Sequence, residues 1–184
     1  MISKRAKIGK NVIIKEGVII EDNVVIGDNC YIDYNAIIKS NVVLGDHSFV
    51  GAGCILGEFL NDFFSSFSNV NHPLRIGKHA VIRSQSILYG NSEIGDYFST
   101  GHKVIIREKT QIENHVSIGT LTDIQGDCHI GNYTRLHSNV HVGMKTKLDD
   151  FVWVFPYVVF TNDPTPPSEN LSGVTVEKFA VIST

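Results

Sequence analysis

The chain has 184 residues, of which 42% are hydrophobic and 19% are charged, and its formal net charge at pH 7 is −3. This length suits one domain with an elongated core. A mildly acidic chain without a basic run is a poor candidate for binding nucleic acid, and no apolar run reaches the length that spans a membrane. We therefore expect one soluble domain that binds neither nucleic acid nor membranes.

An apolar residue recurs at every sixth position in two long stretches of the chain. The first stretch consists of Ile8, Ile14, Ile20, Ile26, Ile32, Ile38, Leu44, Val50 and Leu56. The second consists of Ile76, Ile82, Leu88, Ile94, Thr100, Ile106, Ile112, Ile118, Ile124, Ile130, Leu136, Val142, Leu148, Val154 and Phe160, with Thr100 as its only polar member. A period of six matches neither a helix nor simple strand alternation, but it fits a short strand with two inward side chains followed by a turn. The pattern predicts an all-β solenoid of hexapeptide repeats.

Glycines that follow the apolar residues show how many hexads make one coil. Gly9, Gly27 and Gly45 are spaced by eighteen residues, and the same spacing resumes at Gly77 and Gly95. Three hexads per coil make a triangular prism, in which each strand bonds to its copy eighteen residues on, about 4.8 Å away. Glycine suits a recurring corner because it enters left-handed backbone conformations at little cost.

Two insertions interrupt the repeat, and we expect a single domain over residues 1–184 with loops at 57–75 and 161–175. Counting in eighteens places both loops at the same corner of the triangle, five coils or roughly 24 Å apart. Loops on one edge of a rigid scaffold usually shape a binding site. The alternative is a length variation without a role, but the four phenylalanines of the first loop are unusual for a purely solvated segment.

The three cysteines, Cys30, Cys54 and Cys128, occupy the small inward position of a hexad. They are expected to be core residues of a protein in a reducing compartment, the cytoplasm. The repeat is in phase from Ala6, so no signal or transit peptide is expected. At the other end the chain stops at Thr184 without the polar cap of most solenoids, which suggests that a longer chain continues there.

The hexads, the eighteen-residue coils and the edge loops together resemble the left-handed β-helix acyltransferase superfamily. Residues 101–108, 118–142 and 160–164 are similar to bacterial N-acetyltransferases of nucleotide-linked amino sugars, particularly dTDP-linked 3-amino-3,6-dideoxyhexoses. The resemblance implies the left hand of the helix, acetyl-CoA as co-substrate, and a role in surface glycan (lipopolysaccharide or O-antigen) biosynthesis. It also implies a homotrimer with active sites between neighbouring subunits.

The outward positions divide into two apolar-aromatic faces and one charged face. The first face carries Tyr97, His115, Tyr133, Phe151 and Trp153; the second carries Ile105, Leu121, Asn139, His141, Tyr157 and Val159; the third carries Asn91, Glu93, Lys109, Gln111, Asp127, His129, Lys145 and Lys147. A ring of three parallel prisms would bury two faces of each subunit, which fits the trimer. The alternative is that the aromatic residues stack along the solenoid and stabilise it alone.

The candidate catalytic residues are His137, His141 and Asp123. Asp123 precedes His141 by eighteen residues and should lie beside it, one coil away. A carboxylate partner holds the tautomer of a histidine and raises its basicity, as a general base requires. His137 stands at a corner, and its replacement by alanine is expected to lower turnover at least tenfold. For any single histidine the alternative is a polar residue that fills a turn or an interface.

The remaining site residues are assigned partly by chemistry and partly by resemblance. The candidates for substrate binding are His102, Arg107, Asn139, Phe63 and Phe64, and those for binding the acyl donor are Phe155, Tyr157, Asn162 and Asp163. A guanidinium suits a diphosphate, and a phenylalanine ring can stack on a nucleotide base. Because Pro156 has no N–H, the backbone N–H of Phe155 or Tyr157 is the expected donor to the oxyanion near that corner.

Three other functions remain open. The acceptor could be a hydroxyl, which would make the protein an O-acetyltransferase. A zinc hydratase like the γ-class carbonic anhydrases uses the same fold, but His137 and His141 are four residues apart on a corner and a strand, a poor geometry for a shared zinc, so no metal is expected. The third alternative is a non-catalytic β-helix module.

Overall fold

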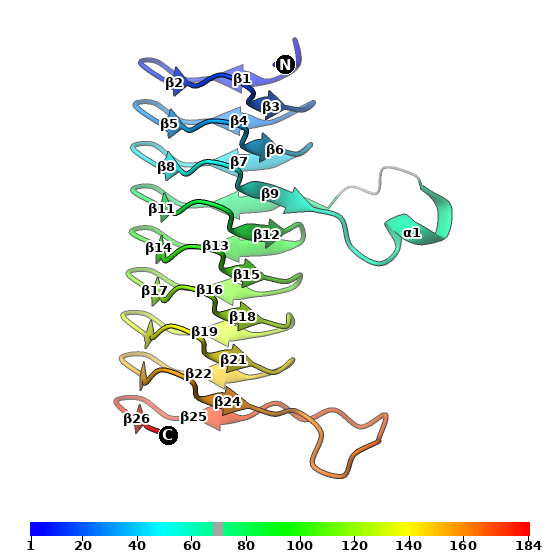
Figure 1. Cartoon of the computed structure of the whole chain (residues 1–184), viewed down its shortest axis with the longest axis vertical. Helices are drawn as coiled ribbons and strands as arrows, with labels where there is room; N and C mark the ends of the chain where they lie inside the picture. Colours follow the sequence, from blue (N-terminus) through cyan, green and yellow to red (C-terminus); the bar gives the residue numbers. More distant parts are fainter. Residues whose placement is uncertain (68–71) are drawn as a thin grey trace.

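The computed structural model describes residues 1–67 and 72–184, and over them the chain forms a parallel β-solenoid with three sheets (Figure 1). Lys7 pairs with Val25, eighteen residues on, as the glycine spacing predicts. The register also continues across both insertions, because Val43 pairs with Arg75 and Lys147 with Thr175. The all-β fold class and the triangular coil are confirmed.

The strands of each sheet lie one above another along the solenoid axis. The first sheet contains β1 (Lys7–Ile8), β4 (Val25–Ile26), β7 (Val42–Leu44), β10 (Leu74–Ile76), β13 (Ser92–Ile94), β16 (Gln111–Ile112), β19 (His129–Ile130), β22 (Lys147–Leu148) and β25 (Thr175–Val176). The second contains β2 (Ile13–Ile14), β5 (Tyr31–Ile32), β8 (Phe49–Val50), β11 (Val81–Ile82), β14 (Ser99–Thr100), β17 (Ser117–Ile118), β20 (Arg135–Leu136), β23 (Trp153–Val154) and β26 (Val181–Ile182). The third contains β3 (Ile19–Ile20), β6 (Ile37–Ile38), β9 (Ile55–Glu58), β12 (Ile87–Tyr89), β15 (Ile105–Ile106), β18 (Asp123–Ile124), β21 (His141–Val142) and β24 (Val159–Phe160).

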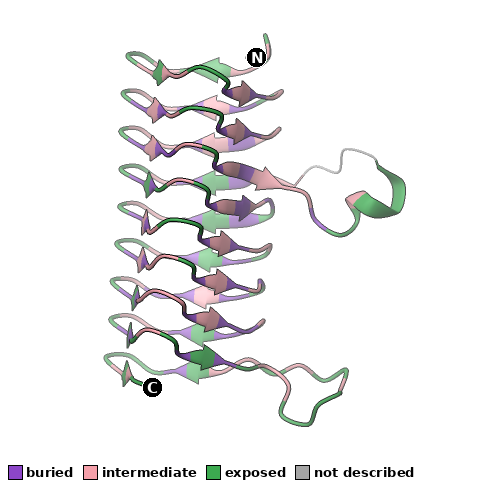
Figure 2. Cartoon of the chain, viewed as in Figure 1, coloured by how far each residue is buried: buried purple, intermediate pink, exposed green. Residues whose placement is uncertain are grey.

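The hexad residues form the core because the second residue of each two-residue strand points into the prism. Ile20, Ile82 and Ile106 are fully buried, and buried residues alternate with more exposed ones along each coil (Figure 2). The polar exception, Thr100, is also inside, and its hydroxyl accepts a hydrogen bond from the Arg83 N–H at 2.9 Å. This bond compensates for taking the hydroxyl out of water.

The corner that precedes the second sheet carries a column of stacked rings. The column consists of His47, His79, Tyr97, His115, Tyr133, Phe151 and Phe179. Their centroids are 4.6 to 5.2 Å apart, and every member has a positive φ. Tyr97, His115, Tyr133 and Phe151 were predicted to lie on one face with Trp153. This prediction is wrong for the four, because they occupy the left-handed turn, whereas Trp153 lies on a strand.

Both insertions follow strands of the third sheet, which agrees with their expected place at one corner of the triangle, and they project on the same side (Figure 1). The first follows β9 and contains the short helix α1 (Phe63–Ser66); its residues 68–71 lie outside the described part. The second follows β24. No helix in residues 1–67 or 72–184 is long and apolar enough to cross a membrane.

Cys30, Cys54 and Cys128 are buried in the core, as expected. Burial raises the pKa of the Cys128 thiol to about 11, whereas an unfolded thiol ionises near pH 8.5. Folding is therefore favoured by the neutral thiol below about pH 8.5, and this contribution is lost as the pH rises through the folded value. We expect no cysteine to react with a thiol reagent at pH 8 until the chain is denatured, when all three should react. Rapid labelling of the folded protein would contradict their placement.

Candidate functional site

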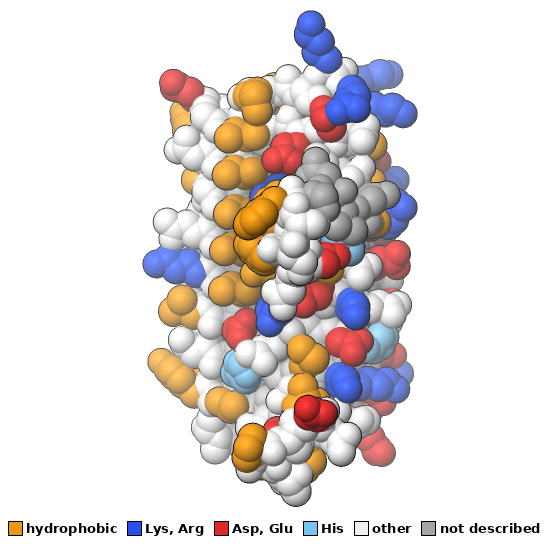
Figure 3. All heavy atoms as spheres, turned by 90° about the vertical axis from the view of Figure 1, so that its right-hand side faces the viewer, with side chains coloured by type: hydrophobic (Ala, Val, Ile, Leu, Met, Phe, Trp, Pro, Cys, Tyr) orange, Lys and Arg blue, Asp and Glu red, His pale blue; other side chains and the backbone are white. Residues whose placement is uncertain are grey.

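A groove runs along the third sheet beneath the first loop, with a volume of about 730 Å³. It is lined by Glu58, Phe59, Asn61, Phe64, Ile87, Tyr89, Ile105, Arg107 and Asp123. The strands β12, β15 and β18 supply its floor, and the loop forms its roof. Figure 3 shows this edge of the molecule, where hydrophobic side chains of the loop stand above charged side chains of the solenoid.

The two phenylalanines predicted to contact a base have different environments. Phe63 is stacked on Phe59, with ring centroids 3.9 Å apart, and contacts Phe64 edge-on at 5.5 Å. Phe64 is 62% exposed and lines the groove, whereas Phe63 does not. Phe64 is thus the ring that a ligand in the groove would meet.

Tyr89 and Arg107 lie in the same column of the groove floor, eighteen residues apart. The guanidinium carbon of Arg107 is 5.8 Å from the Tyr89 ring centroid. Burial, followed by the charge of Glu58, raises the pKa of the Tyr89 phenol. Tyr89 was not among the residues predicted for the site, although it lies eighteen residues before Arg107 and the repeat therefore places the two side by side.

The guanidinium of Arg107 is already paired, which affects its proposed role with a diphosphate. Its Nε and a terminal nitrogen donate to the two carboxylate oxygens of Glu108 at 3.1 and 2.9 Å. The positive charge that Arg107 brings to the groove is therefore largely compensated, and the Glu58 carboxylate on the groove wall is likewise paired with Lys39. Asp123 also lines the groove and has no Lys or Arg partner among the described residues, so its carboxylate is the charge that suits a cationic group better than a diphosphate.

Asp123 and His141 are brought together as predicted. They are direct neighbours in the register of β18 and β21, and His141 Nδ1 lies 3.2 Å from Asp123 Oδ2. Both side chains are about one-third exposed, so the pair is accessible while still fixed by the sheet; Asp123 lines the groove, and His141 lies one coil beyond it. Since Nδ1 faces the carboxylate, Nε2 is the nitrogen left to exchange a proton with a ligand.

His137 belongs to a different cluster at the corner that precedes the third sheet. Its ring stacks on Trp153 and Phe155, with both centroid distances 5.7 Å. No hydrogen bond or ion pair between described residues joins it to His141 or Asp123. His102 and Asn139 lie near the same corner, His102 exposed and Asn139 in the left-handed conformation with φ 59°.

The predicted oxyanion donors are wrong. The Phe155 N–H donates to the Ile182 carbonyl at 2.9 Å, and the Tyr157 N–H donates to the Ser138 carbonyl at 3.3 Å. Neither N–H group is free, because backbone groups at the corners of this solenoid form hydrogen bonds to the neighbouring coil, as those in the strands do. The side chains of Phe155 and Tyr157 stay available, at 41% and 70% exposure.

The carboxylate of Asp163 organises the second loop. It accepts hydrogen bonds from the Thr165 N–H and from both the N–H and the hydroxyl of Ser168, and the hydroxyl bond is the main cause of a lowered Asp163 pKa. The Asn162 carbonyl accepts the Ser172 N–H at 2.8 Å. Asp163 is therefore occupied in shaping the loop, and the Asn162 side chain is the freer of the two.

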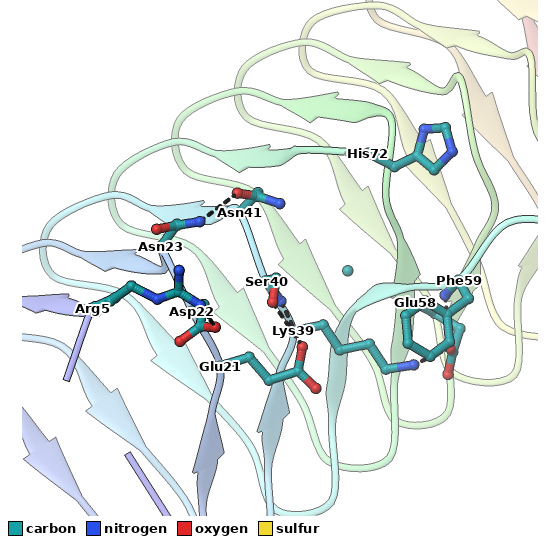
Figure 4. Close-up of a pocket in the computed structure, with 11 residues that line it drawn as sticks. Arg5, Glu21, Asp22, Asn23, Lys39, Ser40, Asn41, Glu58, Phe59 and His72 are labelled. Carbon is teal, nitrogen blue, oxygen red and sulfur yellow. Dashed lines mark hydrogen bonds and ion pairs between the residues drawn. The ribbon is translucent and has the colours of Figure 1, made fainter. Parts of the chain in front are cut away.

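A second hollow, of about 170 Å³, lies on the N-terminal side of the first loop (Figure 4). Both the arginine and the lysine on its wall are paired with a carboxylate, Arg5 with Asp22 and Lys39 with Glu58, and His72 Nε2 lies 2.6 Å from Asp62 Oδ2. No group of three or more His, Cys, Asp or Glu side chains in the described ranges is placed to hold a metal ion. The groove along the third sheet is the candidate site.

Two family profiles match segments of this chain. The profile described as bacterial transferase hexapeptide (six repeats) matches residues 23–58 and 109–143, and that of the hexapeptide repeat of succinyl-transferase matches residues 2–34. No curated protein sequence matches the chain significantly. The matched segments carry the hexads that build the solenoid.

Solved structures of acyltransferases share the fold. LpxA, a UDP-N-acetylglucosamine acyltransferase from Bacteroides fragilis, is 22% identical with a TM-score of 0.85, over 98% of this chain and 68% of its own. The UDP-N-acetylglucosamine acyltransferase from Campylobacter jejuni is 20% identical with a TM-score of 0.77, over 87% of this chain and 68% of its own. These structural similarities support the β-solenoid fold of this chain.

Proposed function

Because the chain carries the hexapeptide repeats of bacterial transferases, we propose that it is an acyltransferase that uses acetyl-CoA and acetylates the amine of a nucleotide-linked sugar. A dTDP-linked 3-amino-3,6-dideoxyhexose is the proposed acceptor, and surface glycan biosynthesis in the cytoplasm the proposed setting. The observation that carries the proposal is the Asp123–His141 pair at the end of a groove with an aromatic roof. The two solved relatives named above are acyltransferases of a nucleotide sugar, which supports the substrate class.

The chemistry needs one group that exchanges protons. An amine is largely protonated at neutral pH, so Nε2 of His141 accepts a proton from it, while Asp123 stabilises the imidazolium. The neutral nitrogen attacks the thioester carbonyl carbon, a C–N bond forms, and the C–S bond breaks as the tetrahedral intermediate collapses. The second nitrogen proton and the one held by His141 leave with the CoA thiolate and the solvent, which gives an amide and free CoA thiol.

The charge of the groove favours an amine over a hydroxyl acceptor. Asp123 lines it without a Lys or Arg partner among the described residues, whereas Glu58 is compensated by Lys39 and Arg107 by Glu108. A negative wall attracts an ammonium group and gives no advantage to a neutral hydroxyl. We propose that Phe64 and Tyr89 offer ring faces to the base or sugar. In this arrangement the diphosphate points out of the groove toward His102, which lies on an exposed corner.

We further propose that the working unit is a homotrimer. Exposed apolar side chains gather toward the C-terminal end: Leu121, Phe151, Trp153, Phe155, Tyr157, Val159, Phe179 and Val181. A soluble protein rarely leaves so much apolar surface in water. A neighbouring subunit would cover it and bring a second wall to the His137 corner, with the side chains of Phe155, Tyr157 and Asn162 placed to contact the acyl donor.

The direct test is release of free CoA thiol from acetyl-CoA in the presence of dTDP- and UDP-linked 3-amino and 4-amino sugars. We expect thiol release with an amino sugar and none with its hydroxyl counterpart. Turnover of the hydroxyl sugar alone would replace the proposal by O-acetyl transfer. Silence with every acceptor, together with no protection of the protein against heat by CoA, would favour the non-catalytic module.

A further inference from the structure

A lysine at the root of the first loop makes two interactions outside the groove. The Lys39 side chain, just after β6, is 13% exposed and forms an ion pair with Glu58. Its Nζ lies 3.3 Å from the centroid of the Phe59 ring (Figure 4). A buried ammonium is costly unless it is paired, so both contacts hold this side chain and its partners in one arrangement.

The chain leaves the solenoid directly against Lys39. Gly57 has a φ of +80°, and a Cβ at this position would lie 2.7 Å from Val42 Cγ2 and 3.4 Å from Lys39 Cβ. The backbone can turn outward here only because residue 57 lacks a side chain. The loop therefore begins in a fixed direction, with Glu58 and Phe59 delivered to the lysine.

Ring contacts connect the lysine to the groove. Phe59 stacks on Phe63 with an interplanar angle of 5°, and Phe63 meets Phe64 edge-on at 82°. Phe64 and Phe59 line the groove, but Lys39 does not. Lys39 therefore supports the roof from the opposite side without reaching the space that a ligand would occupy.

We propose, resting on the proposed function, that Lys39 is a positioning residue that sets the aromatic roof over the acceptor site and so sets the affinity for the acceptor. The ammonium orients Phe59, Phe59 orients Phe63, and Phe63 orients Phe64. The Asp123–His141 pair is held separately by the register of β18 and β21. The effect of Lys39 is accordingly confined to acceptor binding and leaves the chemical step and the acyl donor unaffected.

The test compares Lys39→Met with Lys39→Arg. The methionine keeps the apolar stem and removes the charge, and we expect the KM for the acceptor to rise about tenfold, with kcat and the KM for acetyl-CoA within about twofold. The arginine keeps a cation over the ring and should restore most of the acceptor KM. Phe64→Ala should raise the acceptor KM as well, and adding Lys39→Met to it should have little further effect, because both act on the same roof.

Lys15→Met is the matched control. Lys15 Nζ also lies over aromatic rings, 5.6 Å from the centroid of Tyr31 and 5.7 Å from that of Tyr34, but away from the loop. It should leave every kinetic constant unchanged. An unchanged acceptor KM in Lys39→Met would overturn the proposal, and so would equal losses in kcat and both KM values.

A second measurement is independent of activity. Amide hydrogen exchange should quicken in residues 58–67 of Lys39→Met and stay unchanged in the solenoid coils. Unchanged exchange in the loop, or faster exchange throughout, would reject the positioning role. If the unmodified protein turns over no acceptor, the proposed function fails, while exchange still decides whether Lys39 holds the loop.

Discussion

Replacing His141 by alanine should lower kcat at least about 100-fold, because a positioned general base contributes about 10²- to 10⁴-fold to a proton-transfer step. His141 is the only histidine of the candidate set for which the described residues provide a carboxylate partner, Asp123 at 3.2 Å. The measurement is thiol release at saturating acetyl-CoA and acceptor. The KM for acetyl-CoA should change little, since the imidazole acts on the acceptor nitrogen.

Two further variants distinguish the proposed general base, His141, from residues that orient it or the substrate. Asp123→Asn keeps the shape but removes the charge that stabilises the imidazolium, so kcat should fall by less than in His141→Ala. His137→Ala removes a ring that stacks on Trp153 and Phe155 and should cost about tenfold, as expected of an orienting residue rather than a base. Near-normal turnover of His141→Ala, or a larger loss in His137→Ala, would transfer the role of base to His137.

Phe98→Ala should be among the most destabilising single changes in the protein, at about 3–5 kcal/mol. Phe98 is fully buried and occupies a position that smaller residues fill in adjacent coils, Ala80 and Val116. Thr100, two residues on and also buried, is smaller than Ile82 and Ile118 at the same position of the adjacent coils, so the volume gained at Phe98 is offset by the volume lost at Thr100. The alanine variant would leave a cavity that a stack of hydrogen-bonded coils can close only in part.

The measurement is urea unfolding followed by circular dichroism, with Phe67→Ala as the control. Phe67 is 76% exposed, and its ring contacts that of Phe63 in a T-shaped arrangement with centroids 5.9 Å apart. Its replacement should change the free energy of unfolding by less than about 0.5 kcal/mol. Equal unfolding midpoints for the two variants would refute the packing argument.

The repeat made much of the molecule predictable. Because each coil hydrogen-bonds to the next with one register, a residue eighteen places on lies directly beside the first, and the Asp123–His141 contact followed from counting. The positions of both loops followed from the same count. The hydrogen bonds of the backbone N–H groups at the corners were not predicted correctly. Phe155 and Tyr157 were expected to offer free N–H donors, and each instead bonds to a neighbouring coil.

The sequence by itself determined the all-β prism, its inward residues and the edge from which the loops leave, because these depend on a periodic pattern and a repeated hydrogen-bond register. Only the tertiary structure decided that Phe64 faces the groove while Phe63 packs against Phe59, and that Arg107 is neutralised by Glu108. It also placed Lys39 under the loop. These contacts join residues in no periodic relation, so their geometry depends on how a single, non-repeating loop packs against the coils.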